Sequence, residues 1–563
     1  MSSKNNFEIG QNKERRSSSF LFGVVFLSLW FFRFGIHGWD NGIFLDDWGI
    51  YGKNYIFDTI PSVQGIFSSM YRPLGFFLLY NLSRLWENFQ IVHLISSALH
   101  GVNAVLVFWI AKRVFGRAES YICCLFFLLF PIPSEAVYWA SCIHNVLGVT
   151  IGCASILLAF EYGANGIYYK FILTAMALLS AAIYEQSTML FCVSIGVCLL
   201  QEIKEKSWQL KRLSLCLLPL IGLGVYFILF RITTTSFPGD QFSLNPLHLI
   251  PSKYGETLIT YIKISLFGWV AQKFIWNGFW SGINSIFSKW WLLLLFIGTL
   301  FLATGVTWVR ARKRERVSSW RPLTAFIVSL GIILVTLSIF SLTRESWFSL
   351  RVTYAPSIGL SLLVGLLVGG AFRVLKDKKW SQWYHPAVVL LLVFAFLPVN
   401  YSELTQYRRQ RDLDIYQARQ IQSYFPKIEE GAFFWLLNIP WVTQEVTVLY
   451  NEHIVNIWAA GDWGTKSILS CMYRKRIDGK PLYSGKNILP SDFPPSFSNT
   501  YVLWFDKGSF YPVYEIVLLA TSGESRKYRF PLMGRLADSH QKRVITLEAV
   551  DRLDRYPNSE NGR

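Results

Sequence analysis

Long apolar runs separated by short basic segments constrain the fold of this chain more than any other feature. Many of these runs reach the roughly 20 residues that an α-helix needs to cross a bilayer. Of the 563 residues, 52% are hydrophobic and only 16% are charged, whereas soluble domains carry about 25% charged residues. The sequence therefore predicts an α-helical, polytopic membrane protein.

The short basic segments predict the side of the membrane that each loop faces. The N-terminal tail, residues 1–17, contains Lys4, Lys13, Arg15 and Arg16, and such residues are retained on the cytoplasmic side. No small-residue cleavage site follows the first apolar run, so we expect it to remain as a helix. The net charge of +18 is thus an orientation signal, and we expect no nucleic-acid partner.

This alternation predicts eleven or thirteen transmembrane helices within residues 18–400. The two counts differ in whether residues 257–287 hold no full crossing or two. The other crossings are predicted at about residues 18–36, 91–111, 118–133, 142–160, 168–184, 187–202, 213–230, 289–309, 322–342, 352–372 and 383–399. Residues 401–563 are then outside, and their alternating helical and strand-like segments predict a soluble α/β domain with its own core. The strand-like segments are residues 433–439, 446–450, 501–505, 513–520 and 544–550, and residues 455–473 are expected to be helical.

The first outer loop, residues 37–90, carries the most informative residues. Asp46 and Asp47 form a carboxylate pair shortly after the first helix, and Arg72 follows within Tyr-Arg-Pro-Leu. Charged residues beside a bilayer are costly and usually functional. The apolar segment 75–86 after Arg72 is too short to cross, so we expect it to lie flat on the outer surface.

Further polar residues fall at predicted outer helix ends. Each could simply face water or headgroups, but the alternation brings them all to one face, where we expect Arg72 and Arg351 to approach each other with Glu135 and Glu185 beside them. The candidate donor-phosphate and substrate-binding residues are Arg72, Glu135, His144, Asn145, Glu185, Arg344, Arg351 and Tyr354.

Sugar transfer from a lipid phosphate suits these residue types. An ionised Asp can take the proton of the acceptor, and arginine offers a planar fork for the oxygens of the leaving phosphate. Asp46 and Asp47 are therefore the candidate catalytic residues. The alternative for Asp46 is a helix N-cap, although two adjacent acids exceed what a cap needs.

The ordered motifs resemble the GT-C glycosyltransferases over residues 18–400. They are the outer Asp-Asp pair, Tyr-Arg-Pro-Leu, His93-Leu-Ile-Ser-Ser-Ala-Leu-His100, Pro131-Ile-Pro-Ser-Glu-Ala-Val-Tyr-Trp139 and Arg351-Val-Thr-Tyr-Ala-Pro-Ser-Ile-Gly359. The set is most similar to the membrane part of TPR-containing O-mannosyltransferases and their bacterial relatives. It is more distantly similar to protein O-mannosyltransferases and the lipid A aminoarabinose transferase.

This resemblance implies an inverting transferase that works at the outer face, with Asp46 or Asp47 as the catalytic base. It implies a polyprenyl-phosphate-linked sugar as donor, a protein, lipid or glycan as acceptor, and a setting among membrane lipids, as in a bacterial inner membrane. The chain departs from the relatives at several positions, and no TPR repeats follow. Phe130 and Pro133 stand for histidines, Asn145 and Leu350 for acids, and Tyr184 for a lysine.

Cofactors and alternative functions stay open at this point. The Asp pair could hold Mg²⁺ or Mn²⁺ through oxygen ligands, but arginines can neutralise a leaving monophosphate without metal, which favours metal independence. The eight cysteines show no paired spacing, so neither a disulfide framework nor a zinc site is predicted. A lipid-linked sugar transporter or flippase, or an inactive GT-C-like scaffold, are the alternatives. A polymerase or ligase fits the Asp-Asp loop less well.

Overall fold

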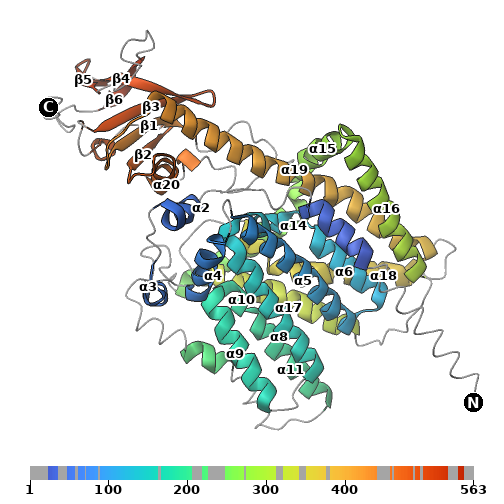
Figure 1. Cartoon of the computed structure of the whole chain (residues 1–563). Coiled ribbons are helices and arrows are strands. Elements are labelled where there is room, and N and C mark those ends of the chain that lie inside the picture. Colours follow the sequence, from blue (N-terminus) through green and yellow to red (C-terminus); the bar gives the residue numbers. More distant parts are fainter. Residues whose placement is uncertain are drawn as a thin grey trace, which may run out of the picture. The chain divides into compact units, whose positions relative to one another are not determined.

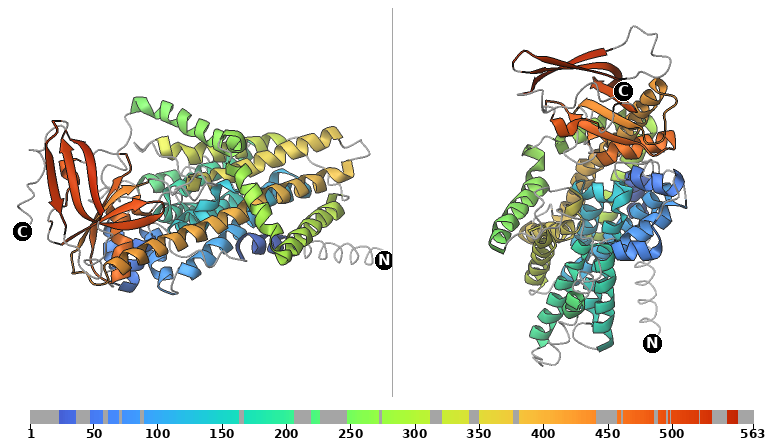
Figure 2. Two further views of the ribbon diagram at one scale, coloured as in Figure 1. Left: turned by 90° about the horizontal axis from the view of Figure 1, so that it is seen from above. Right: turned by 90° about the vertical axis from the view of Figure 1, so that its left-hand side faces the viewer.

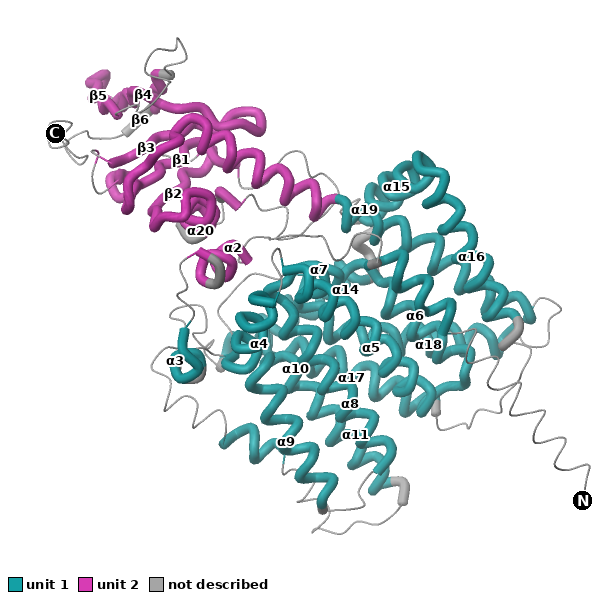
Figure 3. The backbone as a smooth tube through the Cα atoms, viewed as in Figure 1, with its two compact units in different colours: residues 1–41, 61–405 teal, residues 42–60, 406–563 magenta. Residues whose placement is uncertain are grey.

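The computed structural model divides the chain into two compact units (Figure 3). Unit 1 comprises residues 1–41 and 61–405, and unit 2 comprises residues 42–60 and 406–563. The predicted residues Asp46 and Arg344 lie outside the part of the chain that the structure describes. That part is residues 23–35, 47–56, 61–69, 72–85, 89–162, 167–205, 219–225, 247–271, 274–311, 321–341, 350–375, 381–440, 457–459, 462–485, 489–494, 497, 499–520, 522–530 and 543–550.

Unit 1 is built from apolar helices, which confirms the predicted class of multi-pass membrane protein. Within the described residues, seven helices are long and apolar enough to cross a bilayer. Figures 1 and 2 show the helices of this unit side by side. The seven are α5 (Gln90–Val114), α8 (Ile143–Tyr162), α11 (Leu190–Glu205), α16 (Trp290–Ala311), α17 (Arg321–Ser341), α18 (Pro356–Leu375) and α19 (Ser381–Tyr424).

A bent helix pair makes an eighth candidate span if its two helices are counted as one. Helix α6 (Arg117–Leu129) continues through the 3₁₀ turn η4 (Ile132–Ser134) into the short helix α7 (Glu135–Tyr138), with a bend of 56°. Pro131 and Pro133 fall in this break, and proline lacks the N–H that a continuous helix needs. The break places Glu135 at the start of a new helix.

Shorter helices complete the unit. Segment 75–86 belongs largely to α4 (Pro73–Ser83), whose 11 residues span about 16 Å, too little to cross the membrane; its flat orientation stays a prediction. The stretch 257–287 forms parts of α14 (Ile250–Ala271) and α15 (Phe274–Phe287). Helix α9 (Ile167–Ile183) leads into α10 (Glu185–Thr188), and the π-helical turn η1 (Phe31–Gly35) ends the first apolar helix.

Helix α15 packs very closely on α19 at one glycine. A Cβ atom on Gly282 would overlap the Pro398 carbonyl, whereas one on Gly298 of α16 would meet nothing within 4 Å. Gly282→Ala is expected to destabilise the protein by about 1–3 kcal/mol through overpacking. Gly298→Ala, the matched control, should be neutral or stabilising because alanine favours helix. Thermal unfolding in detergent would measure both, and equal melting temperatures would contradict the packing.

Unit 2 contains a six-stranded sheet in the order β2-β1-β3-β4-β5, with β6 also pairing with β4. Strand β1 lies parallel to β2 and β3, whereas β3 and β4 form an antiparallel hairpin. Lys507 and Gly508 at its turn both have positive φ, as a type I′ hairpin requires. The strands are β1 (Phe433–Ile439), β2 (Asp478–Tyr483), β3 (Thr500–Asp506), β4 (Ser509–Ala520), β5 (Ser525–Arg529) and β6 (Arg543–Val550).

The core of this sheet is aromatic and aliphatic, with Trp435, Val502, Ile516 and Tyr528 among its buried members. Helix α20 (Asp462–Tyr473) packs against β2, and α2 (Asp47–Tyr51) of the first loop packs against α20. Four predicted strands and the predicted helix are thus found, which confirms the C-terminal α/β fold. The fifth predicted strand, residues 446–450, lies outside the described residues.

Candidate active site

Arg72 stands immediately before α4, at the N-cap position. Proline disfavours the helical conformation in the residue before it, and Arg72, which precedes Pro73, has φ −125° and ψ 66°. The next turn lies tightly against its neighbours, because a Cβ on Gly75 would come within 2.7 Å of the Ile183 carbonyl oxygen and 3.0 Å of His144 Cβ. The Pro and Gly of this segment therefore bring Arg72 to the ends of α8 and α9.

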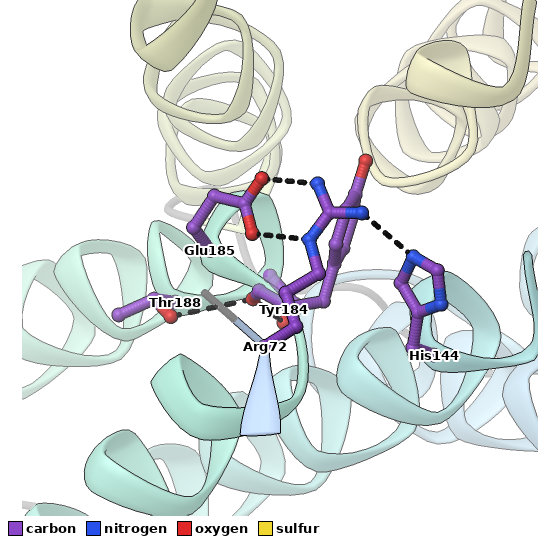
Figure 4. Close-up of polar contacts among 6 residues, drawn as sticks. Arg72, His144, Tyr184, Glu185 and Thr188 are labelled. Atoms are coloured by element: carbon purple, nitrogen blue, oxygen red, sulfur yellow. Dashed lines mark hydrogen bonds and ion pairs between the residues drawn. The ribbon is translucent and has the colours of Figure 1, made fainter. Parts of the chain in front are cut away.

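The Arg72 side chain lies between a carboxylate and an imidazole (Figure 4). Its Nε donates to Glu185 Oε2 at 2.6 Å, its Nη2 donates to Glu185 Oε1, and its Nη1 lies 2.8 Å from His144 Nε2. The guanidinium carbon is 4.4 Å from the centre of the Tyr184 ring. Since a guanidinium only donates, His144 Nε2 accepts this bond. Arg72 is thus held in one orientation from three sides.

A second arginine, Arg351, lies in the 3₁₀ turn η7 (Leu350–Thr353). Its backbone N–H donates to Glu135 Oε2 at 3.2 Å, and its guanidinium carbon is 4.7 Å from the centre of the Trp139 ring. Glu135 is fully buried. Gln186, beside Glu185, donates to the Val352 carbonyl at 2.7 Å, so η7 is tied to both α7 and α10.

The segments that carry the two arginines are both bound to α10. Glu185 binds the Arg72 guanidinium, and Gln186 binds the carbonyl of Val352, the residue after Arg351. Residues 279 positions apart in the sequence are therefore linked through one short helix. Such an arrangement of forked donors can bind the oxygens of a phosphate.

The other predicted residues have different surroundings. Asn145 is 1% exposed, and neither atom of its amide has a hydrogen-bond partner. The Tyr354 hydroxyl lies 2.9 Å from His100 Nδ1 and 3.0 Å from Asn103 Nδ2, in the interior of the helices. Asp47 is buried in α2 and belongs to unit 2.

Two residues that take part in these contacts were missed by the sequence analysis. Gln186 follows Glu185. Arg33 lies within the first apolar run, and its Nη1 is 3.2 Å from Nε2 of His100, the residue that contacts Tyr354. An arginine in a membrane helix is by itself a signal of function, and this signal could have identified Arg33. For metal, no three His, Cys, Asp or Glu side chains gather anywhere in the described ranges, which do not include Asp46.

No family model matches the sequence, and no curated protein matches it. Solved structures do match: ArnT from Cupriavidus metallidurans in the apo state shares 13% identity and a TM-score of 0.46, covering 87% of this chain and 93% of ArnT. ArnT from the same organism bound to undecaprenyl phosphate shares 14% identity and a TM-score of 0.40, covering 86% of this chain and 92% of ArnT. The third match is the archaeal oligosaccharyltransferase AglB from Archaeoglobus fulgidus in complex with an inhibitory peptide and a dolichol-phosphate. It shares 9% identity and a TM-score of 0.41, covering 87% of this chain and 69% of AglB.

Each of these matches has an identity below 15% and a TM-score below 0.5. At these identities and TM-scores the matches carry no argument about this chain, and no residue's role passes from them to it.

Proposed function

We propose that this protein is an inverting glycosyltransferase that moves a sugar from a polyprenyl-phosphate donor to a protein, lipid or glycan acceptor at the outer membrane face. One observation carries the proposal: Glu185 and Gln186 of α10 bind the Arg72 guanidinium and the turn that carries Arg351, respectively. Positive charge placed where a phosphate leaves stabilises the transition state. Glu185 holds two donors of Arg72 in a fixed plane, which limits the reorganisation needed during the reaction.

The reaction proceeds by direct displacement. The acceptor oxygen attacks the anomeric carbon from the face opposite the phosphate, the bond from that carbon to the phosphate oxygen breaks, and the lipid phosphate leaves with the electron pair. A carboxylate takes the acceptor proton, and the resemblance assigns this role to Asp46 or Asp47. The two arginines receive the developing phosphate charge.

Binding of the lipid phosphate tests the proposal directly. Purified protein in nanodiscs is titrated with a short-chain polyprenyl phosphate and with the matching polyprenol. We expect the phosphate to bind and the polyprenol to compete poorly. Arg351→Gln should weaken phosphate binding by roughly 10- to 100-fold, as expected for one charge-assisted hydrogen bond. Equal binding of phosphate and alcohol, or of wild type and variant, would refute the phosphate site.

The bent helix pair α6–η4–α7, with its angle of 56°, favours a lipid-linked sugar transporter or flippase as the second candidate function, because transporters use interrupted helices. Proteoliposomes holding a fluorescent polyprenyl-phosphate sugar distinguish the two. Movement of the lipid between leaflets without sugar transfer would support the transporter, whereas transfer to an acceptor without movement supports the enzyme.

We also propose that the N-terminus is cytoplasmic and that residues 401–563 are outside, because of the basic segments between helices. Ser252 and Ser525 are exposed, whereas Ser402 is buried. Cysteines introduced at Ser252 and Ser525 should react with an impermeant maleimide in intact cells, while a cysteine at Lys4 should react only after permeabilisation. Wild-type protein serves as the control for labelling of the native cysteines. The reverse labelling pattern would show that the orientation is opposite to the proposed one.

A further inference from the structure

Arg33, in η1, is a fully buried arginine in the membrane part of the chain. Its Nη1 lies 3.2 Å from His100 Nε2 and also donates to the Leu128 carbonyl, and its Nη2 donates to Ser134 Oγ at 2.8 Å. Its charge also acts on the buried carboxyl group of Glu403 in α19. A buried charge in a membrane helix is expensive, so this network is expected to have a use.

One branch of the network leads from Arg33 to Glu135. Ser134, which accepts the Arg33 hydrogen bond, is the residue before Glu135 and ends η4. Glu135 in turn accepts the backbone N–H of Arg351 at 3.2 Å. Arg33 therefore holds the turn from which Glu135 reaches Arg351.

The other branch leads through His100. Its Nδ1 lies 2.9 Å from the Tyr354 hydroxyl, and the Tyr354 backbone N–H bonds the Arg351 carbonyl at 3.2 Å. Asn103 supports this branch by donating to the same hydroxyl at 3.0 Å. The two branches meet at the backbone of Arg351, one at its N–H and the other at its carbonyl.

We infer that Arg33 is a positioning residue that fixes the backbone, and through it the guanidinium, of Arg351 for lipid-phosphate binding. This inference rests on the proposed function. The planar guanidinium donates in two directions at once, to His100 on one side and to Ser134 on the other. A lysine ammonium is a point charge on a flexible stem, so it can oppose Glu403 but cannot hold both branches. Arg33→Lys therefore separates the positioning role from charge balance in the core.

A double-mutant cycle tests this coupling in the full-length protein in nanodiscs, with short-chain polyprenyl phosphate as the probe. We expect Arg33→Lys to weaken binding about tenfold in the wild-type background, and to have no further effect in the Arg351→Gln background, because residues in one network are not additive. The melting temperature of Arg33→Lys should stay near that of wild type. Ser155→Ala, which removes a buried 2.8 Å contact to Ser194, is the control and should leave binding unchanged.

The outcomes separate the inference from the proposed function. If Arg351→Gln weakens binding but Arg33→Lys does not, or if their effects multiply, Arg33 does not act through Arg351 and the inference falls alone. If Arg351→Gln has no effect, both fall. Should Arg33→Lys fail to fold, Tyr354→Phe breaks the second branch without changing a charge. It must then weaken binding in the wild-type background only, and an unchanged affinity overturns the inference.

Discussion

Transfer of sugar from polyprenyl phosphate is expected to fall by about 10²–10⁴-fold when Asp46 and Asp47 are both replaced by Asn, since general-base catalysis contributes factors of this size. Asparagine keeps the size and polarity of the side chain but cannot accept the acceptor's proton. Expression and binding of the lipid donor should therefore stay close to wild type. We expect Asp46→Asn alone to cause most of the loss and Asp47→Asn to cause less.

The assay follows radiolabelled sugar from polyprenyl phosphate in membranes that contain equal amounts of each variant. Asp412→Asn is the matched control, because the Asp412 side chain is 66% exposed in α19 and pairs only with its neighbour Arg411 in the contacts observed. Full activity in the double variant would refute the proposed mechanism and would favour a transporter or an inactive scaffold instead.

Loss of Arg72 is expected to affect both stability and binding. Arg72→Met leaves the Glu185 carboxylate, 21% exposed, without its two-pronged partner, and breaking a largely buried ion pair costs about 3–5 kcal/mol. The same change removes one of the two arginines of the proposed phosphate site. We therefore expect a lower melting temperature and no measurable binding of short-chain polyprenyl phosphate.

A second variant separates these two effects. In Arg72→Met, Glu185→Met both charges are absent, so no carboxylate is left unpaired, and most of the lost stability should return. Binding should not return, because the guanidinium is still missing. Thermal unfolding and lipid titration on the same samples measure both quantities. Recovered phosphate binding in the double variant would show that Arg72 serves the fold and not the ligand.

The sequence predicts the apolar elements well because their signal is local. The run 433–439 forms β1 with the same bounds, and Pro73 marks the start of α4. Strands β2 and β5 were missed, since their sequences DGKPLY and SRKYR carry little hydrophobic signal. Both are at the ends of the strand order, where each pairs with a single neighbouring strand. Their strand conformation therefore depends on that neighbour and cannot be predicted from the local sequence.

For the candidate site, threading through the membrane limits which residues can meet, because each helix end must lie on one side. It brings Arg72, Glu185 and His144 to one face, and the structure shows them in contact. It cannot give side-chain partners, so the stacking of Arg351 on Trp139 was not foreseen. Nor could it show that residues 42–60, with Asp47, cluster with the C-terminal residues.

The strand order of unit 2 determines how long each strand must wait for its pairing partner during synthesis of the chain. Strand β1 is apolar and pairs on one side with β3, which is completed roughly 70 residues later in the chain, a delay of about 3–14 s at usual rates of synthesis. Strand β4 ends at Ala520 and waits in the same way for β6, which ends at Val550. Until then these edges are open to wrong pairing with other chains. Lower growth temperatures, or chaperones in the compartment where unit 2 folds, are therefore expected to improve the yield of intact protein.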